Sequence, residues 1–154
     1  MKKGFALIEL IVAIGISLLA VGGLIVNYNN YNDNQRLKQA ALTLKNNLRF
    51  AQTQAVSAKK PASGCTELVG YTVSFTSGTY AIAATCTEGA VGDVLPVTLP
   101  SGVSFAPVPS SFTFDVLNRG LVGSDAVTIT LAGIAKSYRI QISKGGDIND
   151  LGFL

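Results

Sequence analysis

A run of apolar residues near the N-terminus constrains this chain more than any other feature. It extends from Phe5 to Val26 and reads FALIELIVAIGISLLAVGGLIV, 22 residues with one charged side chain, Glu9. A helix of this length, rising about 1.5 Å per residue, would measure about 33 Å and could cross the hydrocarbon core of a bilayer. Because Lys2 and Lys3 precede the run, we expect them to stay cytoplasmic and the residues beyond it to be exported.

Two simpler interpretations of the run stay open, a cleaved secretory signal peptide and a plain signal anchor. The run is longer than a usual signal core, and no A-x-A-like site precedes a polar mature start. Neither interpretation explains Glu9, because a carboxylate at mid-bilayer costs roughly 2.5–3.5 kcal/mol. We therefore expect Glu9 to have a partner, unless it is a tolerated charge that snorkels to the interface.

The residues from Lys2 to Ile11, KKGFALIELI, resemble the prepilin signature of type IV pilins and type II secretion pseudopilins. The resemblance implies that a prepilin peptidase cuts between Gly4 and Phe5 and that Phe5 becomes N-methylated. Glu9 matches the carboxylate of that signature, and it can face the new Phe5 ammonium of a neighbouring subunit. Such a pair would favour an axial stagger between subunits of a filament, since each charge is costly when unpaired in a low dielectric.

Beyond the apolar run the composition becomes polar, and no proline occurs from Asn27 until Pro61, so one helix can continue to about residue 60. Apolar residues then recur in steps of four and three, the period of a helix face that packs on a core. These residues are Leu37, Ala41, Leu44, Leu48, Ala51, Ala55 and Ala58.

After Pro61 the pattern changes to alternation of apolar and polar residues, interrupted by Gly, Asn, Pro and Ser clusters. Such segments predict strands of an antiparallel sheet with one buried face. The apolar positions are Val69/Tyr71/Val73/Phe75, Tyr80/Ile82/Ala84, Phe112/Phe114/Val116, Val127/Ile129/Leu131 and Tyr138/Ile140/Ile142.

The two cysteines of the chain, Cys65 and Cys86, flank the first two of these segments. They lie in the part expected to be exported, so we expect a disulfide, with two free buried thiols as the alternative. With a turn at Ser77-Gly78, residue 90 would oppose Cys65. The bridge therefore requires a bulge or a loop excursion.

The later segments also resemble one subgroup, the H-type pseudopilins and their minor-pilin relatives (GspH/FimT-like). The matching stretches are 48–56, 112–120 and 138–146. Some relatives carry an Arg-rich motif after the final glycine that is linked to DNA uptake. Here Gly146 is followed by Asp147-Ile148-Asn149-Asp150, and acidic residues repel phosphate, so the resemblance does not imply DNA binding.

Residues for catalysis or metal binding are scarce. The chain has no His, no Gly-x-Ser-x-Gly and no P-loop, so we expect no catalytic site, and two cysteines alone cannot hold zinc. Asp147, Asn149 and Asp150 could offer oxygens to Ca²⁺, but that ion takes about 6–8. We expect a solvated turn there, and no metal or cofactor. Removing Lys2 and Lys3 from the net charge of +3 leaves +1, which is too weak a field to indicate a nucleic-acid partner.

The sequence thus predicts an α+β fold, a pilin-like lollipop in which a long N-terminal helix, half in the membrane and half amphipathic, packs on a small antiparallel β-sheet. Residues 1–4 would be a prepilin leader and 5–26 a transmembrane and filament-core helix. Residues 27–60 would continue as the amphipathic helix, and 61–154 would form a β-rich periplasmic or extracellular head.

The function that the resemblance implies is structural. The chain would be a subunit of a type IV pilus-like filament, as a type II secretion pseudopilin of the H type or a minor pilin. Its partners would be homologous subunits, the prepilin peptidase, an inner-membrane assembly platform and the lipid bilayer. It would be a single-pass inner-membrane protein before assembly. A shaft-forming pilin and a membrane-tethered binding module or adhesin that never polymerises are the alternatives.

Overall fold

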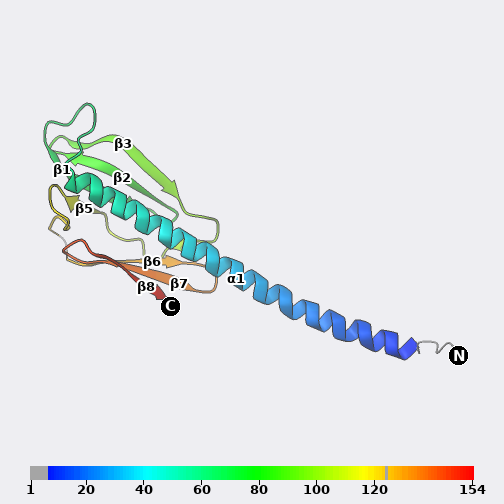
Figure 1. Ribbon diagram of the computed structural model, residues 1–154. Coiled ribbons are helices and arrows are strands. Elements are labelled where there is room, and N and C mark those ends of the chain that lie inside the picture. The colour runs from blue at the N-terminus through cyan, green and yellow to red at the C-terminus, as the bar shows by residue number, and fades with distance from the viewer. Residues whose placement is uncertain (1–6, 124) are drawn as a thin grey trace.

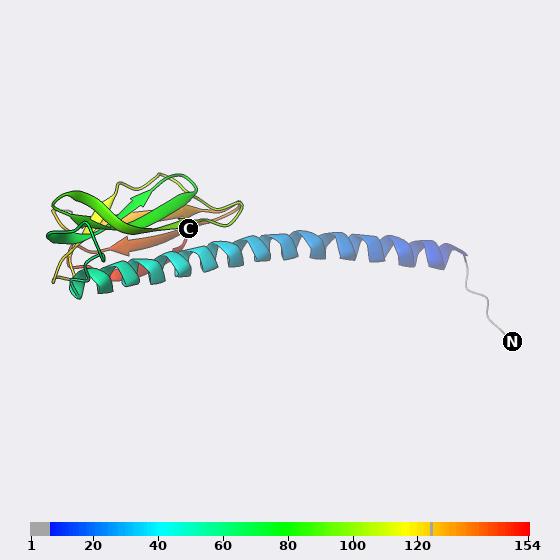
Figure 2. The same ribbon diagram turned by 90° about the horizontal axis from the view of Figure 1, so that it is seen from above.

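The computed structural model of the chain describes residues 7–123 and 125–154, and of residues 19–29, 90, 92 and 93 it describes the backbone alone. Within this part, one helix precedes eight strands. The helix, α1 (Leu7–Val56), is a single element of 50 residues. Its N-terminal part projects away from the strands, and its C-terminal part lies along them (Figures 1 and 2).

The C-terminal part of α1 is amphipathic and supplies one wall of the core. The expected apolar stripe is buried from Leu37 to Ala55, together with Ala40. The helix ends where Ala58 takes a positive φ of 47°. There the Ala58 and Lys59 N–H groups donate to the carbonyls of Ala55 and Gln54, a Schellman pattern that satisfies the last turn.

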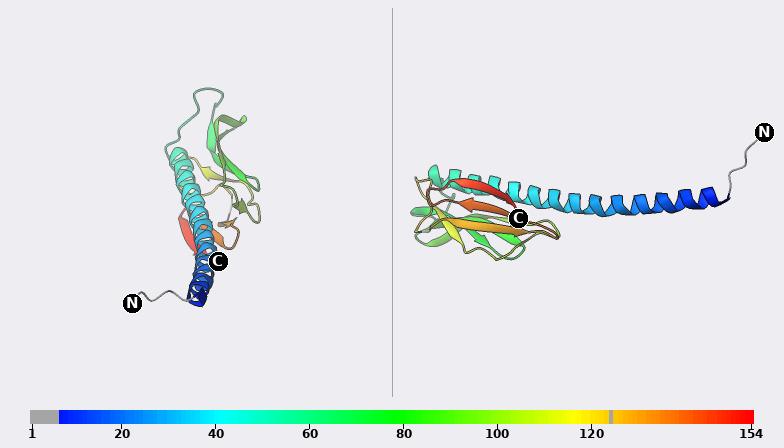
Figure 3. Two further views of the ribbon diagram at one scale, coloured as in Figure 1. Left: turned by 90° about the vertical axis from the view of Figure 1, so that its right-hand side faces the viewer. Right: turned by 90° about the horizontal axis from the view of Figure 1, so that it is seen from below.

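The strands form two antiparallel sheets of four strands each, with the orders β3-β2-β1-β5 and β4-β6-β7-β8. The first sheet comprises β1 (Leu68–Phe75), β2 (Thr79–Cys86), β3 (Gly89–Thr98) and β5 (Phe112–Asp115). The second comprises β4 (Ser104–Phe105), β6 (Val127–Ala132), β7 (Ser137–Ile142) and β8 (Ile148–Phe153). The two sheets flank α1, and the helix contacts strands of both (Figures 1 and 3).

The predicted fold class, a pilin-like lollipop with one small antiparallel sheet, is wrong. The head contains two four-stranded sheets. Among the described residues, no helix is both long and apolar enough to cross a membrane. The error about the sheets has a physical cause. Alternation along a strand shows which face is buried, but it does not show which strands exchange hydrogen bonds, so strands of two sheets looked like members of one.

The five predicted alternations nevertheless coincide with strands, and most of their apolar positions face the shared core. Ala84 and Val116 pack in a separate small cluster, and the register shift at the start of β1 buries Leu68 instead of Val69. Tyr80, Phe114 and Ile140 are among the largest fully buried side chains. One continuous apolar cluster joins the helix stripe to both sheets. The helix and the sheets thus form one packed head, to which the projecting part of α1 is attached.

Two of the four outer strands, β3 and β8, carry features that hinder pairing with further strands. β3 contains Pro96, which has no N–H to offer. β8 has an irregular register opposite Arg139 and Ile140, and its Gly152 has a φ of 87°. Proline, bulges and irregular edges are usual protections against sheet-to-sheet aggregation.

Candidate assembly surface

The projecting part of α1 presents apolar side chains that nothing in the described chain covers. Its large apolar residues between Leu7 and Leu18 are 52–76% exposed, and they point in all directions around the axis. They are Leu7, Ile8, Leu10, Ile11, Val12, Ile14, Ile16 and Leu18. A helix that is apolar all round is stable only when buried in lipid or among other chains, so this surface requires a partner.

Glu9 lies within this apolar surface, in the first turn of the helix. Its side chain is exposed. Of the two ion pairs found among the described residues, neither involves Glu9. The predicted processing residues Gly4 and Phe5 lie outside the described residues. The proposed contact between Glu9 and a neighbour's Phe5 therefore stays a prediction.

Polar contacts fix the buried part of α1 to the head. Gln52 is 8% exposed, and its side-chain amide donates to the carbonyls of Arg119 (2.8 Å) and Gly146 (2.7 Å). The Asn47 amide donates to the Tyr80 hydroxyl at 2.7 Å. Gln52 was not among the residues predicted to matter, although its spacing of four residues from Leu48 places it on the apolar stripe.

The solvated turn predicted for the acidic residues after Gly146 is only partly right. Asp147 follows the turn at Lys144 and Gly145, is exposed, and its N–H donates to the Ser143 hydroxyl oxygen at 3.0 Å. Asn149 and Asp150 belong instead to β8, and the Asp150 carboxylate pairs with Lys45 of α1. In the described part of the chain, no three His, Cys, Asp or Glu side chains gather in a group that could hold a metal ion.

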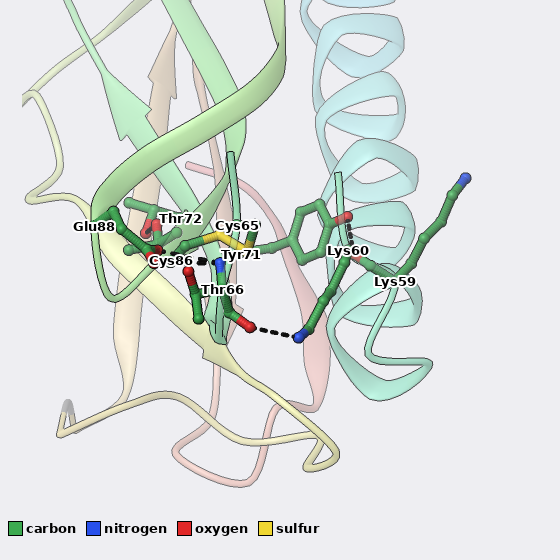
Figure 4. The surroundings of a disulfide bond; sticks show 9 residues. Lys59, Lys60, Cys65, Thr66, Tyr71, Thr72, Cys86 and Glu88 are labelled. Carbon is green, nitrogen blue, oxygen red and sulfur yellow. Dashed lines mark hydrogen bonds between the residues drawn. A yellow bond between two sulfur atoms is a disulfide. The ribbon is translucent and has the colours of Figure 1, made fainter. Parts of the chain in front are cut away.

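The predicted disulfide is confirmed. Cys65 and Cys86 are bonded, with their Cα atoms 5.6 Å apart. The spacing required a bulge or a loop excursion, and the structure contains both. Cys65 lies in the loop before β1, and the register of β1 on β2 shifts between Leu68 and Gly70, so that Cys86 pairs with Leu68. The bond ties the loop after α1 to the end of the first hairpin (Figure 4).

We expect Cys65→Ser to destabilise the chain by about 3 kcal/mol, because the bond closes a loop with a sequence separation of 21 residues. Urea denaturation of the detergent-solubilised protein, followed by tyrosine fluorescence, measures the change. A reductant should lower the midpoint of the wild type and leave the variant unchanged. Equal midpoints for wild type and variant would show that the bond contributes nothing to stability.

Three tyrosines of the head are held in their neutral form by burial. Desolvation raises the pKa of Tyr80, and the hydrogen bond from Asn47 offsets part of this rise. Desolvation also raises the pKa of Tyr71, and it raises that of Tyr138 together with the nearby Asp150 charge. For each of these tyrosines the pKa is higher in the folded than in the unfolded chain. The contribution of the neutral side chain to the stability of the head is therefore complete below the unfolded pKa, and it is lost as the pH rises through the folded pKa.

The head should therefore lose stability above about pH 10, the ordinary pKa of tyrosine. We expect Tyr80→Phe to lower the melting temperature at neutral pH, because the Asn47 contact is lost. Above pH 10 the melting temperature of the variant should fall less steeply with pH than that of the wild type, because one buried titrating hydroxyl is gone. Thermal melts followed by circular dichroism across this range test the slope. Tyr31→Phe, at a side chain that is 61% exposed, is the control. A slope that is unchanged in Tyr80→Phe would refute the assignment.

Comparison with known proteins does not place the chain in a family. No family, no curated protein and no solved structure matches it. The observations that bear on its function are therefore those of the chain itself.

Proposed function

We propose that this protein is a structural subunit of a filament of the type IV pilus or type II secretion pseudopilus kind. One observation carries the proposal. A projecting helical segment exposes large apolar side chains on every side, with one carboxylate among them, while the rest of the chain forms a packed head. Packing of such segments from many copies would bury the apolar surface.

The same segment also favours helix-mediated assembly over assembly through the sheets. Two of the four outer strands are poor templates for pairing, because β3 carries Pro96 and β8 is irregular at Gly152. In the proposed filament the projecting helices form the centre and the heads lie outside. Before assembly, the N-terminal run from Phe5 would be held in the inner membrane with the head on the far side.

The partners in this proposal are further pilin-like subunits, a prepilin peptidase and a membrane assembly platform. The subgroup resemblance favours a pseudopilin or minor pilin. The H-type assignment rests on that resemblance alone.

Filaments isolated by shearing from cells that contain the assembly machinery test the proposal directly. We expect immunogold labelling of the filaments, and we expect mass spectrometry of their subunits to find a chain that begins at Phe5 with an N-methyl group. Gly4→Val should leave uncleaved precursor in the membrane, because a bulky residue would occupy the cleavage position. A mature chain with Met1 intact, or one cut beyond Val26, would rule out prepilin processing. A correctly processed chain that never enters filaments would indicate a membrane-tethered binding module.

A further inference from the structure

The end of the head from which α1 projects, which we call the base, is built from turns of both sheets. Leu37, the first buried residue of the helix stripe, packs against Gly133 in the turn between β6 and β7. The Leu99 N–H, in the turn between β3 and β4, donates to the Gly78 carbonyl in the turn between β1 and β2 at 2.9 Å. The end of β8 also lies on the side of the head that faces the projecting helix (Figure 1).

The base exposes apolar side chains that the assembly proposal does not use. Ile134 is 73% exposed, and it lies beside Gly102 of the turn between β3 and β4. Leu154 is 60% exposed and Phe153 is 41% exposed at the end of β8. The Lys136 ammonium lies 5.6 Å from the centre of the Phe153 ring. The base therefore combines protruding apolar side chains with one cation.

The charges of the head are distributed unequally between its two ends. The turns of the base are residues 76–78, 99–103 and 133–136, and their one charged residue is Lys136. The loops 57–67, 87–88, 116–126 and 143–147 join the opposite ends of the strands, and they carry both carboxylates and cations. These are Glu67, Glu88, Asp125 and Asp147, and Lys59, Lys60, Arg119 and Lys144. An apolar surface with a cation and without carboxylates suits a lipid bilayer, whose anionic headgroups repel carboxylates.

The apolar run of the helix leads directly to this end of the head. Val26, its last residue, precedes Leu37 by 11 positions, about 16 Å along a helix. The run would measure about 33 Å, and a tilt of about 25° would fit it to a hydrocarbon core of about 30 Å. The head lies on one side of α1 (Figure 2), so a tilt toward that side lowers the base to the headgroups.

We propose that the base of the head docks on the bilayer that anchors α1, with Ile134 and Leu154 among the headgroups and Lys136 at the lipid phosphates. This inference rests on the proposed function, since it requires the apolar run to lie in a membrane. Docking gives an unassembled subunit two separate attachments to the bilayer. It therefore fixes the orientation of the head relative to the membrane, which a single helical anchor leaves free.

A second copy of the chain fits the base less well than a lipid surface does. In a head-to-tail contact, Ile134 and Leu154 would face the opposite end of the next head. That end carries Glu67, Glu88 and Asp125, and apolar side chains packed on it would bury carboxylates without partners. Lipid headgroups tolerate both apolar side chains and a cation at the same depth.

The test uses tryptophan as a reporter, because the chain has none of its own. Ile134→Trp places the reporter at the base, and Leu117→Trp places it at the opposite end, where the native side chain is equally exposed at 75%. Each full chain is reconstituted at low density into vesicles of phosphatidylethanolamine and phosphatidylglycerol with brominated acyl chains. We expect Ile134→Trp to show blue-shifted emission and at least about threefold stronger quenching than Leu117→Trp.

A third variant tests the charge. Lys136→Gln, added to the Ile134→Trp chain, should reduce quenching by about half in the anionic vesicles and have little effect in vesicles of brominated phosphatidylcholine. Equal quenching at the two reporter positions would overturn the docking. Quenching that appears only at high protein density would overturn it too, because a second copy would then be needed.

Flotation of the vesicles on a density gradient separates this inference from the proposed function. If the chain floats with the vesicles but the reporter at position 134 is not quenched, only the docking of the base is wrong. If the chain does not float, the membrane anchor of the proposed function is wrong, and the docking fails with it.

Discussion

A Glu9→Ala chain should reach the membrane and fold its head normally, yet fall at least about tenfold in filament incorporation. The change makes the N-terminal run more apolar, so membrane insertion should hold or improve. Glu9 lies 28 positions before Leu37, the first buried residue of the core stripe, a distance of about 42 Å along a helix. Stability of the head should therefore not change. The partner that disappears is the carboxylate for a neighbour's Phe5 ammonium, and an unpaired charge in a low dielectric costs several kcal/mol.

Three measurements separate assembly from folding in this experiment. Immunoblots of membranes report the amount of protein, thermal melts report the head, and the sheared fraction reports filaments. Glu9→Gln keeps the shape without the charge and should resemble Glu9→Ala more than wild type. Ser17→Ala is a matched control, because this side chain lies in the same projecting segment and bonds its own helix at the Ala13 carbonyl. Normal filaments from Glu9→Ala would mean that Glu9 is a tolerated charge and that the ion pair does not drive assembly.

Gly146→Ala should destabilise the head by about 3 kcal/mol or more, although it adds only one methyl group. Gly146 has a φ of 87°, where a Cβ costs roughly 1–2 kcal/mol. The added Cβ would also overlap the Arg119 carbonyl oxygen and approach the Gln52 amide nitrogen to 2.5 Å. Both hydrogen bonds of that buried amide would be disturbed, and each unsatisfied group costs about 1–3 kcal/mol.

The neighbouring glycine provides the control. A Cβ on Gly145 would meet only the Ser143 hydroxyl oxygen at 3.8 Å, an ordinary contact. Gly145→Ala should therefore change stability by less than about 1 kcal/mol. Urea denaturation of the two variants, measured side by side, compares them directly. If both variants melt together with the wild type, the loop can move away from α1, and the Gln52 contacts do not hold the head together.

The sequence was most informative where burial follows a simple period. The steps of four and three from Leu37 to Ala55 located the buried helix face, and the alternation at Tyr138, Ile140 and Ile142 located the inner face of β7. The offset between Cys65 and Cys86 even indicated the irregular pairing at the start of β1. In each case the pattern depends on neighbours along the chain, so local reasoning is sufficient.

The features that were missed depend on contacts between distant segments. β3 contains Gly92 and Pro96, and β8 contains Asn149, Asp150 and Gly152, so neither has the alternation of a half-buried strand. Their positions are fixed by pairing with β2 and β7. The division of the strands between two sheets likewise has no signature in the alternation.

In the candidate site, too, some features could be predicted from the sequence and others could not. The apolar run and Glu9 could be identified from the sequence, and the structure shows the run exposed from Leu7 to Leu18, with Glu9 exposed within it. A cleft at the end of α1, lined by Phe50 and Tyr71 among others, could not be identified, because these two residues are far apart in the chain and Phe50 lies off the predicted apolar stripe of the helix. Their shared surface depends on the path of the loop that the disulfide fixes.

The attachment of α1 to two sheets has a mechanical consequence. A pull on the projecting end of the helix is transmitted along its axis to the stretch from Leu37 to Ala55, which runs beside β1 and β5 on one side and β7 on the other. The apolar contacts, the Gln52 hydrogen bonds and the pair of Lys45 with Asp150 are then loaded together in shear. Because these contacts are loaded together, no single strand separates first. The head therefore resists tension as one unit and unfolds only when α1 slides relative to both sheets.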